Sequence, residues 1–330
     1  MNKKIAILGS NSFAGACLVA RSLREGFSVL GVNRSSEGHQ IFLPYKQEKN
    51  RHQYCFLKAD INENFEKITT EFENFKPNFI VDLAGQGMVA ESWNQPEQWY
   101  TTNIVAKARL HNWLSQKDWL DRYLRVSTPE VYGSTDALIS ENWSCAPTTP
   151  YAVSHAATDL SLRAFYQHYR FPAMIARFAN FYGPAQQLYR IVPRTIIYAL
   201  TQQRLQLHGG GKSIRAFIFG EDVAEAILCT LSKGTVGEIY HFSPNKFYTI
   251  FDVVKFISER LNIPMDNFVD IAPDRPSKDQ AYLMSSSRAR SELGWTDNTS
   301  FETGIDYTIN WVRANLSEIR KLPQNYVHKV

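Results

Sequence analysis

Residues 3–15 read KKIAILGSNSFAG, and the organisation of the chain can be worked outward from this stretch. The apolar run IAIL stops directly at Gly9, which is typical of a parallel strand buried on both faces. Residues 13–25 then carry a helical pattern that ends at Gly26, a residue suited to terminate a helix. A strand, a glycine turn and a helix in this order predict the first unit of a doubly wound α/β fold.

Strands and helices continue to alternate toward the middle of the chain. This alternation predicts a parallel, doubly wound sheet of the Rossmann-like type. The predicted strands are residues 27–33, 54–59, 78–84, 122–128 and 172–178, and the predicted helices are residues 63–75, 97–117 and 151–170.

The pattern changes after Gly183-Pro184, where shorter elements follow one another. We therefore expect a nucleotide-binding domain over residues 1–178, to which residues 213–243 return, and a smaller α/β cap over residues 179–330. The elements expected after this change are helices at 191–203, 222–231, 250–261 and 302–316, a turn at Gly209–Gly211, a strand at 214–219 and a proline-marked loop at 273–277.

Composition excludes several classes of protein. The 330 residues include 36 Lys and Arg against 32 Asp and Glu, a net charge of only +4, and the basic residues are scattered, so nucleic acid is not an expected partner. No stretch approaches the ~18 apolar residues that a membrane span needs. The apolar run after the first lysines is too short for a signal peptide. We expect a soluble, cytoplasmic protein without a membrane partner.

The chain has four cysteines, at positions 17, 55, 145 and 229. No two are close enough to form a Cys-x-x-Cys pair, so the sequence predicts neither a zinc knuckle nor a redox dithiol, and no metal site. Four reduced thiols in a reducing compartment are the simplest interpretation.

The glycine turn is the first candidate binding motif. Gly9 and Gly15 would let backbone N–H groups approach a pyrophosphate at a helix N-terminus. Ser12 stands where a middle glycine is usual, and Phe13 follows it. A glycine-rich turn that binds nothing is the alternative, but the strand before it and the helix after it favour a dinucleotide.

The end of the second strand bears on the choice of cofactor. NAD-binding folds of this type usually place an acidic residue there, to hold the ribose 2′-OH. Here the strand ends in Asn33, Arg34 and Ser35, and an arginine beside hydroxyl groups suits a 2′-phosphate. This favours NADP over NAD, with a solvated arginine in a loop as the alternative. Asp60, at the end of the third strand, could accept a hydrogen bond from the adenine amino group.

Tyr151 and His155 are four residues apart and share one face of a predicted helix. With the motifs below, they make the chain resemble an extended short-chain dehydrogenase/reductase of the nucleotide-sugar dehydratase and epimerase group. The motifs are the Gly9–Gly15 turn, Leu83-Ala84-Gly85-Gln86, Ser92, Pro96, Asn103, residues 127–133 (STPEVYG), Pro150-Tyr151, residues 177–184 (RFANFYGP), Arg215 before residues 221–223 (EDV), residues 275–279 (RPSKD) and residues 292–295 (ELGW).

The resemblance implies catalytic roles. A tyrosine at position 151 acts as base on a sugar hydroxyl, and a hydroxyl residue at Thr128 bonds the same group. A tyrosine has a reference pKa near 10, so it needs nearby positive charge to act at neutral pH. In the family this charge comes from a lysine four residues on, where this chain has His155. Imidazole is mostly neutral at pH 7, so His155 could bond the nicotinamide ribose but would assist Tyr151 less.

The active-site loop shows a second departure. The 4,6-dehydratases that this chain resembles carry Thr-Asp-Glu in this loop. There, Glu removes the carbon 5 proton and Asp protonates the departing 6-hydroxyl. This chain has Thr128, Pro129 and Glu130. Glu130 indicates chemistry at carbon 5, whereas Pro129 cannot donate a proton, so Glu130 itself or a water would have to serve as the acid. A structural ion pair is the alternative role for Glu130.

The resemblance also implies binding roles and an assembly. NAD(P) would be held by Gly9, Ser12, Phe13, Gly15, Asn33, Arg34, Ser35, Asp60, Ile61, Leu83, Ala84, Gln86 and Asn103. The nucleotide-diphosphate sugar would be held in the cap by Asn180, Arg190, Arg215 and Arg275. A homodimer through the helices at 97–117 and 151–170 is expected.

Three functions remain open from the sequence. The first is an NAD(P)-dependent nucleotide-diphosphate-hexose 4,6-dehydratase, which is a lyase. The second is a nucleotide-sugar epimerase or ketoreductase, which needs no acid at Pro129. The third is an NAD(P)-binding relative without turnover, which His155 and Pro129 support. The nucleotide and the sugar cannot be read from the sequence.

Overall fold

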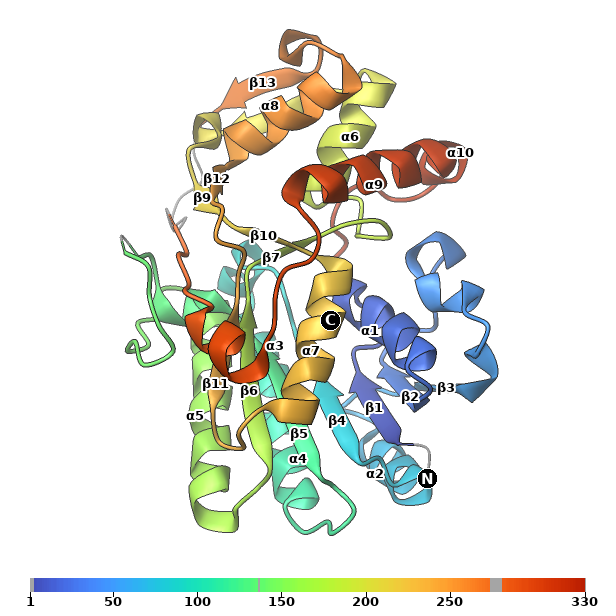
Figure 1. Ribbon diagram of the computed structural model, residues 1–330, viewed down its shortest axis with the longest axis vertical. Coiled ribbons are helices and arrows are strands. Elements are labelled where there is room, and N and C mark those ends of the chain that lie inside the picture. The colour runs from blue at the N-terminus through green and yellow to red at the C-terminus, as the bar shows by residue number, and fades with distance from the viewer. Residues whose placement is uncertain (1–2, 136, 274–280, 330) are drawn as a thin grey trace.

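A seven-stranded parallel sheet forms the centre of the protein, in the order β11-β6-β5-β4-β1-β2-β3 (Figure 1). The computed structural model describes residues 3–135, 137–273 and 281–329. The predicted Rossmann-like α/β class is confirmed. The strands are β1 (Lys4–Leu8), β2 (Ser28–Asn33), β3 (Tyr54–Lys58), β4 (Phe79–Asp82), β5 (Arg122–Ser127), β6 (Ala173–Phe178) and β11 (Ile239–Phe242).

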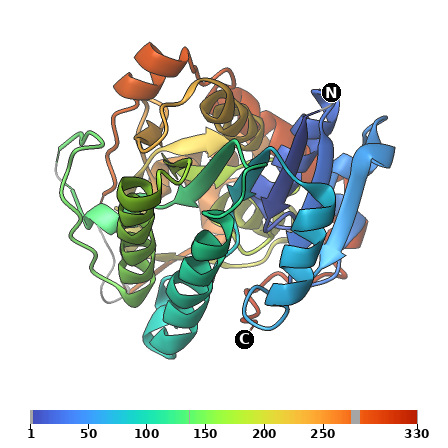
Figure 2. The ribbon, with the colours of Figure 1, turned by 90° about the horizontal axis from the view of Figure 1, so that it is seen from below.

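Helices cover both faces of this sheet (Figure 2). On β1, Ile5 and Ile7 pack into the core shared with α1 (Phe13–Arg24) and α7 (Gly220–Lys233). Alternate residues of a strand point to opposite faces, so Ala6 packs on the other side. The helices there are α2 (Phe65–Phe75), α4 (Ala106–Leu114) and α5 (Pro150–Tyr169). The continuous apolar run at the start of the chain follows from this burial on both faces.

The helix predicted at 97–117 is interrupted in the structure. It consists of α3 (Pro96–Tyr100), a π-helical turn η5 (Thr101–Val105) and α4, which ends at Leu114. A π-helical turn adds a residue to the helical repeat, so a pattern based on 3.6 residues cannot locate it. Asn103 lies in this turn and is fully buried.

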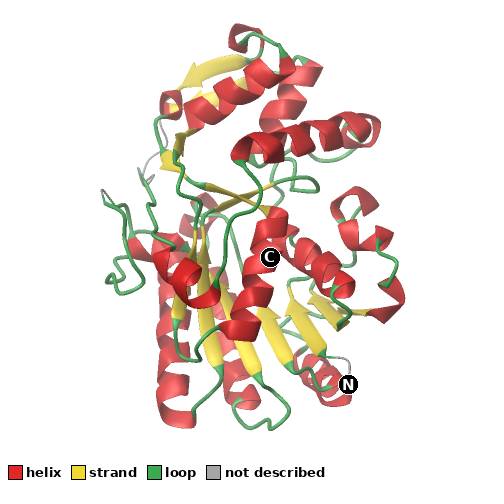
Figure 3. Cartoon of the chain, viewed as in Figure 1, coloured by secondary structure: helices red, strands yellow, loops and turns green. Residues whose placement is uncertain are grey.

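The cap has a separate core (Figure 3). It is built from α6 (Ile191–Thr201), α8 (Ile250–Leu261), α9 (Phe301–Ala314) and α10 (Leu316–Ile319), with the parallel pair β8 (Leu205–His208) and β13 (Val269–Ala272). The apolar side chains of α8 recur with helical spacing and are buried at Val253, Val254 and Ile257. That periodicity explains why the predicted bounds of this helix are those observed.

Short strands join the cap to the sheet domain. The strand predicted at 214–219 is split into β9 (Ile214–Arg215) and β10 (Phe217–Phe219), which pair with different partners. Those partners are β12 (Tyr248–Thr249), antiparallel to β9, and β7 (Asn180–Tyr182), parallel to β10. Runs of two or three residues carry too little pattern to be predicted. The remaining single turns are η1 (Gln40–Phe42), η2 (Pro44–Gln47), η3 (Arg51–Gln53), η4 (Ala90–Trp93), η6 (Pro129–Tyr132), η7 (Gly209–Gly211), η8 (Met265–Asn267) and η9 (Ala289–Leu293).

The strand order reverses beside β1, which pairs with β2 on one side and β4 on the other. In an open parallel sheet, ligands bind outside the carboxyl ends of the strands at such a reversal. The cap stands over that edge of the sheet (Figure 1). Within the described ranges, no helix has the length and apolar character needed to cross a membrane.

Candidate active site

A cleft of about 1410 Å³ lies between the carboxyl edge of the sheet and the cap. It brings together predicted residues from segments far apart in the sequence. The predicted site residues in its lining are Ser12, Phe13, Arg34, Leu83, Ala84, Gln86, Thr128, Glu130, Tyr151, His155, Asn180 and Arg190.

Other predicted residues do not line this cleft. Asp60 accepts a hydrogen bond from the backbone of Asn62 at 2.7 Å and so braces a turn, while the side chain of Asn33 donates to the carbonyl of Ser35 at 3.2 Å. Arg275 lies outside the described residues. The predicted residues outside the lining are Gly9, Gly15, Asn33, Ser35, Asp60, Ile61, Asn103 and Arg215.

The glycine turn is shaped for close backbone approach. Gly9 has φ +85°, and a Cβ there would lie 2.9 Å from the backbone of Ala84. A Cβ on Gly15 would lie 2.2 Å from the Gly9 carbonyl oxygen. Ser12 is the N-cap of α1 and accepts a hydrogen bond from the Gly15 amide at 3.1 Å. Its place in the motif therefore has a structural reason, and the open helix N-terminus fits a pyrophosphate.

Tyr151 lies in the first turn of α5, close to Thr128 at the end of β5. Burial and the Glu130 carboxylate raise the pKa of Tyr151 to about 12, whereas a hydrogen bond with Thr128 and the charges of Arg190 and Arg125 lower it. Thr128 is the N-cap of η6, and its hydroxyl oxygen accepts from the Glu130 amide at 3.3 Å. Its own hydrogen can therefore be directed to the oxygen of Tyr151.

Pro129 occupies the first position of η6. Proline is favoured there because its φ is already helical and the missing N–H has no partner to lose. The residue that replaces the expected acid is thus compatible with the loop, and Glu130 comes one residue later in the same turn. The loop places one carboxylate in the cleft and no carboxylate at position 129.

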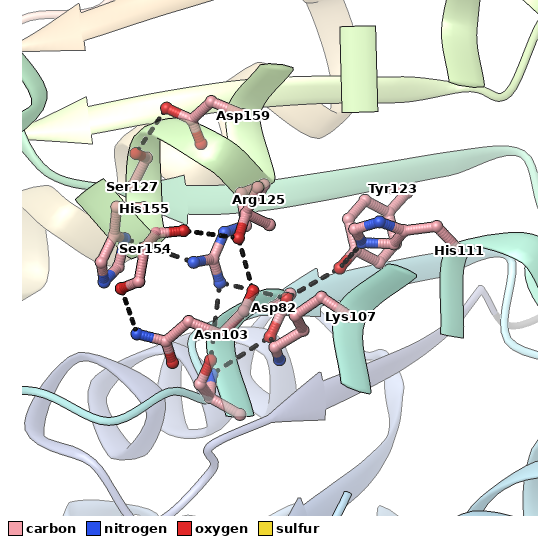
Figure 4. A network of polar contacts seen from close by, with 12 residues as sticks. Asp82, Asn103, Lys107, His111, Tyr123, Arg125, Ser127, Ser154, His155 and Asp159 are labelled. Carbon is pink, nitrogen blue, oxygen red and sulfur yellow. Dashed lines mark hydrogen bonds and ion pairs between the residues drawn. The ribbon is translucent and has the colours of Figure 1, made fainter. Parts of the chain in front are cut away.

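His155 lies one helical turn after Tyr151, with the two ring centroids 4.6 Å apart. Its Nδ1 atom is 3.2 Å from a guanidinium nitrogen of Arg125, which stands on β5 (Figure 4). Burial and the Arg125 charge hold the pKa of His155 well below its usual value. The imidazole is therefore neutral at pH 7.

Arg125 belongs to a buried polar network (Figure 4). The Asp82 carboxylate lies 2.5 Å from Lys107 and 3.2 Å from Arg125, and it accepts a hydrogen bond from Tyr123 at 2.7 Å. Burial opposes the ionised form, but the two cations lower the pKa of Asp82 to about 2. A buried carboxylate is stable only when it is paired in this way.

Asn103 joins the loop after β4 to α5. Its side-chain oxygen accepts from the Gln86 amide at 2.8 Å, and its nitrogen donates to the Gln86 carbonyl at 3.1 Å and to the Ser154 hydroxyl at 2.9 Å. All these groups are buried. Asn103 thus orients the wall of the cleft from behind.

A family described as GDP-mannose 4,6 dehydratase matches residues 7–308. The chain belongs to this family. The resemblance to an extended short-chain dehydrogenase/reductase of the nucleotide-sugar dehydratase and epimerase group is thereby confirmed.

Characterised members of the family are similar over almost the whole chain. The dTDP-glucose 4,6-dehydratase of Neisseria gonorrhoeae is 29% identical, with 95% of this chain and 96% of that protein covered. The dTDP-D-glucose 4,6-dehydratase of Mus musculus is 32% identical, with 95% and 89% covered. The crystal structure of a Streptomyces venezuelae dTDP-glucose 4,6-dehydratase with NAD bound superposes with a TM-score of 0.88 at 25% identity, with 96% and 98% covered. These relatives support a lyase with a 4,6-dehydratase-like function and an NAD(P) cofactor.

The glycine turn supports such a cofactor in this member of the family. A side chain at Gly9 would collide with the backbone of Leu83 and Ala84, and one at Gly15 with the Gly9 carbonyl, so both glycines are needed for the turn to pack at the N-terminus of α1. Ser12 and Phe13 at this helix end and Arg34 after β2 line the same cleft, so these residues would be the ones to hold a dinucleotide.

Two features of this candidate site are not evident from the sequence. One is Arg125. In the sequence it is an ordinary residue of a predicted strand, and only the fold brings it to His155. The other is the segment 325–329, which returns to the cleft from beyond α10. The carbonyl oxygen of Lys329 accepts from Arg34 at 3.0 Å and from Gln86 at 2.9 Å. A ligand that bonded to these two side chains would compete with those hydrogen bonds.

The two described arginines that were predicted to bind substrate lie in different surroundings. Arg190 is the N-cap residue of α6 and lines the cleft. Arg215 is nearly buried, and its guanidinium lies over the ring of Tyr282, 4.4 Å from the ring centroid, while Tyr282 lines the cleft. Arg215 therefore stands behind a residue of the lining.

The buried histidines predict how stability depends on pH. Burial lowers the pKa of His111 to about 3, while a histidine in the unfolded chain titrates near 6.5. As the pH falls below 6.5, His111 is protonated in the unfolded chain but stays neutral in the folded chain. His111 should therefore cost about 2 kcal/mol of folding free energy between pH 7.5 and pH 5. Urea unfolding at a series of pH values measures this loss.

The His111→Gln variant should lose about 2 kcal/mol less stability than the wild type over this pH range. His52 is exposed, so His52→Gln is the matched control and should follow the wild-type curve. Equal pH dependence in the wild type and His111→Gln would contradict the assignment of a neutral buried imidazole.

Proposed function

We propose that this chain is an NAD(P)-dependent nucleotide-diphosphate-hexose 4,6-dehydratase that forms a 4-keto-6-deoxy sugar. The observation that carries the proposal is the meeting of Tyr151, Thr128 and Glu130 in one cleft, beside a glycine turn suited to a dinucleotide. The sheet domain, residues 1–178 with 213–243, would hold the cofactor. Residues 179–330 would hold the nucleotide sugar.

Each side chain has a separate task in this reaction. Tyr151 takes the proton of the sugar 4-hydroxyl, and Thr128 donates a hydrogen bond that stabilises the phenolate. The cofactor, when bound, accepts a hydride from carbon 4 and returns it to carbon 6. Glu130 removes the proton from carbon 5, which the 4-ketone makes acidic.

The acid for the leaving hydroxyl is assigned to Glu130 as well. Pro129 has no proton to give, and Glu130 follows it directly. Once protonated by carbon 5, Glu130 can deliver that proton to the carbon 6 hydroxyl, so that water leaves and a double bond forms between carbons 5 and 6. Hydride then adds at carbon 6, and a proton from solvent water adds at carbon 5. One carboxylate would thus perform both transfers.

Mass spectrometry in heavy water tests this function. The dTDP, UDP, GDP and CDP hexoses are each incubated with the purified protein. A loss of one water with deuterium kept at carbon 5 is expected for one nucleotide. Deuterium gain without water loss would indicate epimerisation at a carbon beside a ketone, and a new isomer of unchanged mass, separated by chromatography, would indicate a 4-epimerase. Sugars unchanged in both mass and chromatography, with tightly bound cofactor, would indicate a relative without turnover.

The Glu130→Gln variant should lower the rate of water loss at least a hundredfold, while carbon 4 is still oxidised. Only the proton transfers at carbons 5 and 6 need the carboxylate. The oxidation is measured from the 4-ketone, which is two mass units lighter than the sugar and is detected as its oxime after trapping with hydroxylamine. Glu141→Gln is the control, since that carboxylate accepts from the backbone of His241 away from the cleft. Normal dehydration by Glu130→Gln would refute the role.

We also propose that the enzyme prefers NADP. Arg34 and Ser35 stand at the end of β2, where no acidic residue is present to hold a ribose 2′-hydroxyl. Arg34→Ala should weaken NADP binding about tenfold and NAD binding much less, because a guanidinium bonds a phosphate more strongly than a hydroxyl. Isothermal titration with both cofactors measures the ratio. A wild type that binds NAD more tightly would disprove the preference.

A homodimer in the cytoplasm completes the proposal. Large apolar side chains are exposed on neighbouring helices, with Val105 at 64% and Leu160 at 60%. Val105 ends η5 and Leu160 lies on α5, so both fall within the segments 97–117 and 151–170 that are predicted to form the dimer. Leu160→Glu should convert the dimer to a monomer in sedimentation velocity, since a charge cannot be buried there without a partner. A wild type that sediments as a monomer would contradict this assembly.

A further inference from the structure

His155 cannot supply the positive charge that a lysine would carry at its position. Arginine nitrogens only donate hydrogen bonds, and Arg125 lies 3.2 Å from Nδ1 of His155. Nδ1 must therefore offer its lone pair, and the proton of the neutral ring lies on Nε2. If Nδ1 were protonated, its N–H would face the N–H of Arg125, and two buried donors would have no acceptor between them.

The charge is present on Arg125 instead. Asp82, Lys107 and Arg125 are each no more than 1% exposed. Two cations share this one carboxylate, at 2.5 Å and 3.2 Å. The cluster thus carries one surplus positive charge. Burial lowers the pKa of Lys107 and the Asp82 carboxylate opposes this effect, while arginine keeps its proton throughout the working range. With both cations charged, Arg125 is the one that contacts His155.

The charged groups around this cluster do not cancel the surplus. Asp159 is 2.7 Å from Arg177 and accepts from the Ser127 hydroxyl, so that pair is already neutral. His111 and Tyr123 are neutral neighbours of Asp82. On the other side, Tyr151 faces the negative Glu130 and the positive Arg190 and Arg125. The Tyr151 ring lies 4.6 Å from the His155 ring, which Arg125 contacts at 3.2 Å. At this position the Arg125 charge acts on the phenol against burial and Glu130.

We propose that Arg125 is a positioning residue, whose guanidinium provides the positive charge beside Tyr151 and holds His155 as a neutral Nε2–H donor in the cleft. This rests on the proposed role of Tyr151 as the base. Figure 4 shows the second ring nitrogen of His155 directed away from Arg125. The roles that one lysine performs, charge and hydrogen-bond donation, are divided between two side chains from β5 and α5.

This arrangement predicts that lysine cannot simply be restored. A lysine at position 155 would bring a second donor-only cation to Arg125, with no acceptor between them. His155→Lys should therefore lower the activity at least tenfold. Adding Arg125→Met to it removes the conflict and should recover much of the loss, so that the two changes are strongly non-additive.

The first experiment observes His155 directly and needs no substrate. Nitrogen-15 NMR of the imidazoles gives the tautomer and protonation of each histidine, and His155→Gln identifies the signals. Wild-type His155 should remain neutral, with the proton on Nε2, from pH 8 to pH 5. Arg125→Met should mix the tautomers and raise the pH at which the ring is protonated. Arg122→Met is the control, because that arginine lies on the same strand but donates to the carbonyl of Gly234.

The second experiment records the pH dependence of kcat/KM on the hexose that reacts. Arg125→Met should move the acidic limb about one unit higher, a tenfold loss at pH 7, because a smaller fraction of Tyr151 is ionised. Arg125→Lys keeps a charge and should rescue most of this shift. His155→Gln can accept from Arg125 and donate to the cleft, so it should lower the rate without moving the limb. Arg122→Met should leave rate and limb unchanged.

The outcomes separate this proposal from the proposed function. A charged His155 at pH 7, or an NMR spectrum of His155 that is unaltered in Arg125→Met, overturns the proposal whatever the activity. Dehydration with an acidic limb that Arg125→Met does not move also overturns it, while the dehydratase stands. If no hexose reacts but His155 behaves as expected, the pairing with Arg125 stands and the function of Tyr151 as a base fails.

Discussion

The geometry of the candidate active site depends on the Asp82 carboxylate. It ends β4, it is completely buried, and it binds Lys107 from α4 and Arg125 from β5. A buried charge without partners costs several kcal/mol, so these elements can pack only in the arrangement that satisfies it. The same arrangement brings the Arg125 guanidinium to the ring of His155 and leaves one uncompensated positive charge behind the cleft.

Buried hydrogen bonds fix the segments that form the walls of the cleft. The π-helical turn brings Asn103 inward, where its side chain fixes the loop after β4 and the first turns of α5. Tyr151 and His155 lie on those turns, and Thr128 caps the short helix that holds Pro129 and Glu130. Their positions therefore follow from packing behind the cleft rather than from flexible surface loops.

The two departures from the family pattern have different physical causes. Pro129 is compatible with the loop because it begins a short helix, and its consequence is chemical, since one acid is missing from the cleft. His155 is accommodated because a neighbouring strand carries an arginine. A substitution that removes a charge from an active site can thus be accompanied by a charge from an element distant in sequence, since electrostatic interactions depend on distance in space.

The sequence by itself determined the α/β class, the bounds of α8, the glycine turn and the candidates Tyr151, Thr128, Glu130 and His155, because apolar periodicity and local motifs are written in consecutive residues. It could not locate the π-helical turn, the paired strands of two or three residues or the return of segment 325–329, since these arise from contacts across the fold. Only the tertiary structure decided the neighbours of His155. Whether that imidazole is neutral depends on Arg125, thirty positions earlier in the chain, and on burial that no single segment determines.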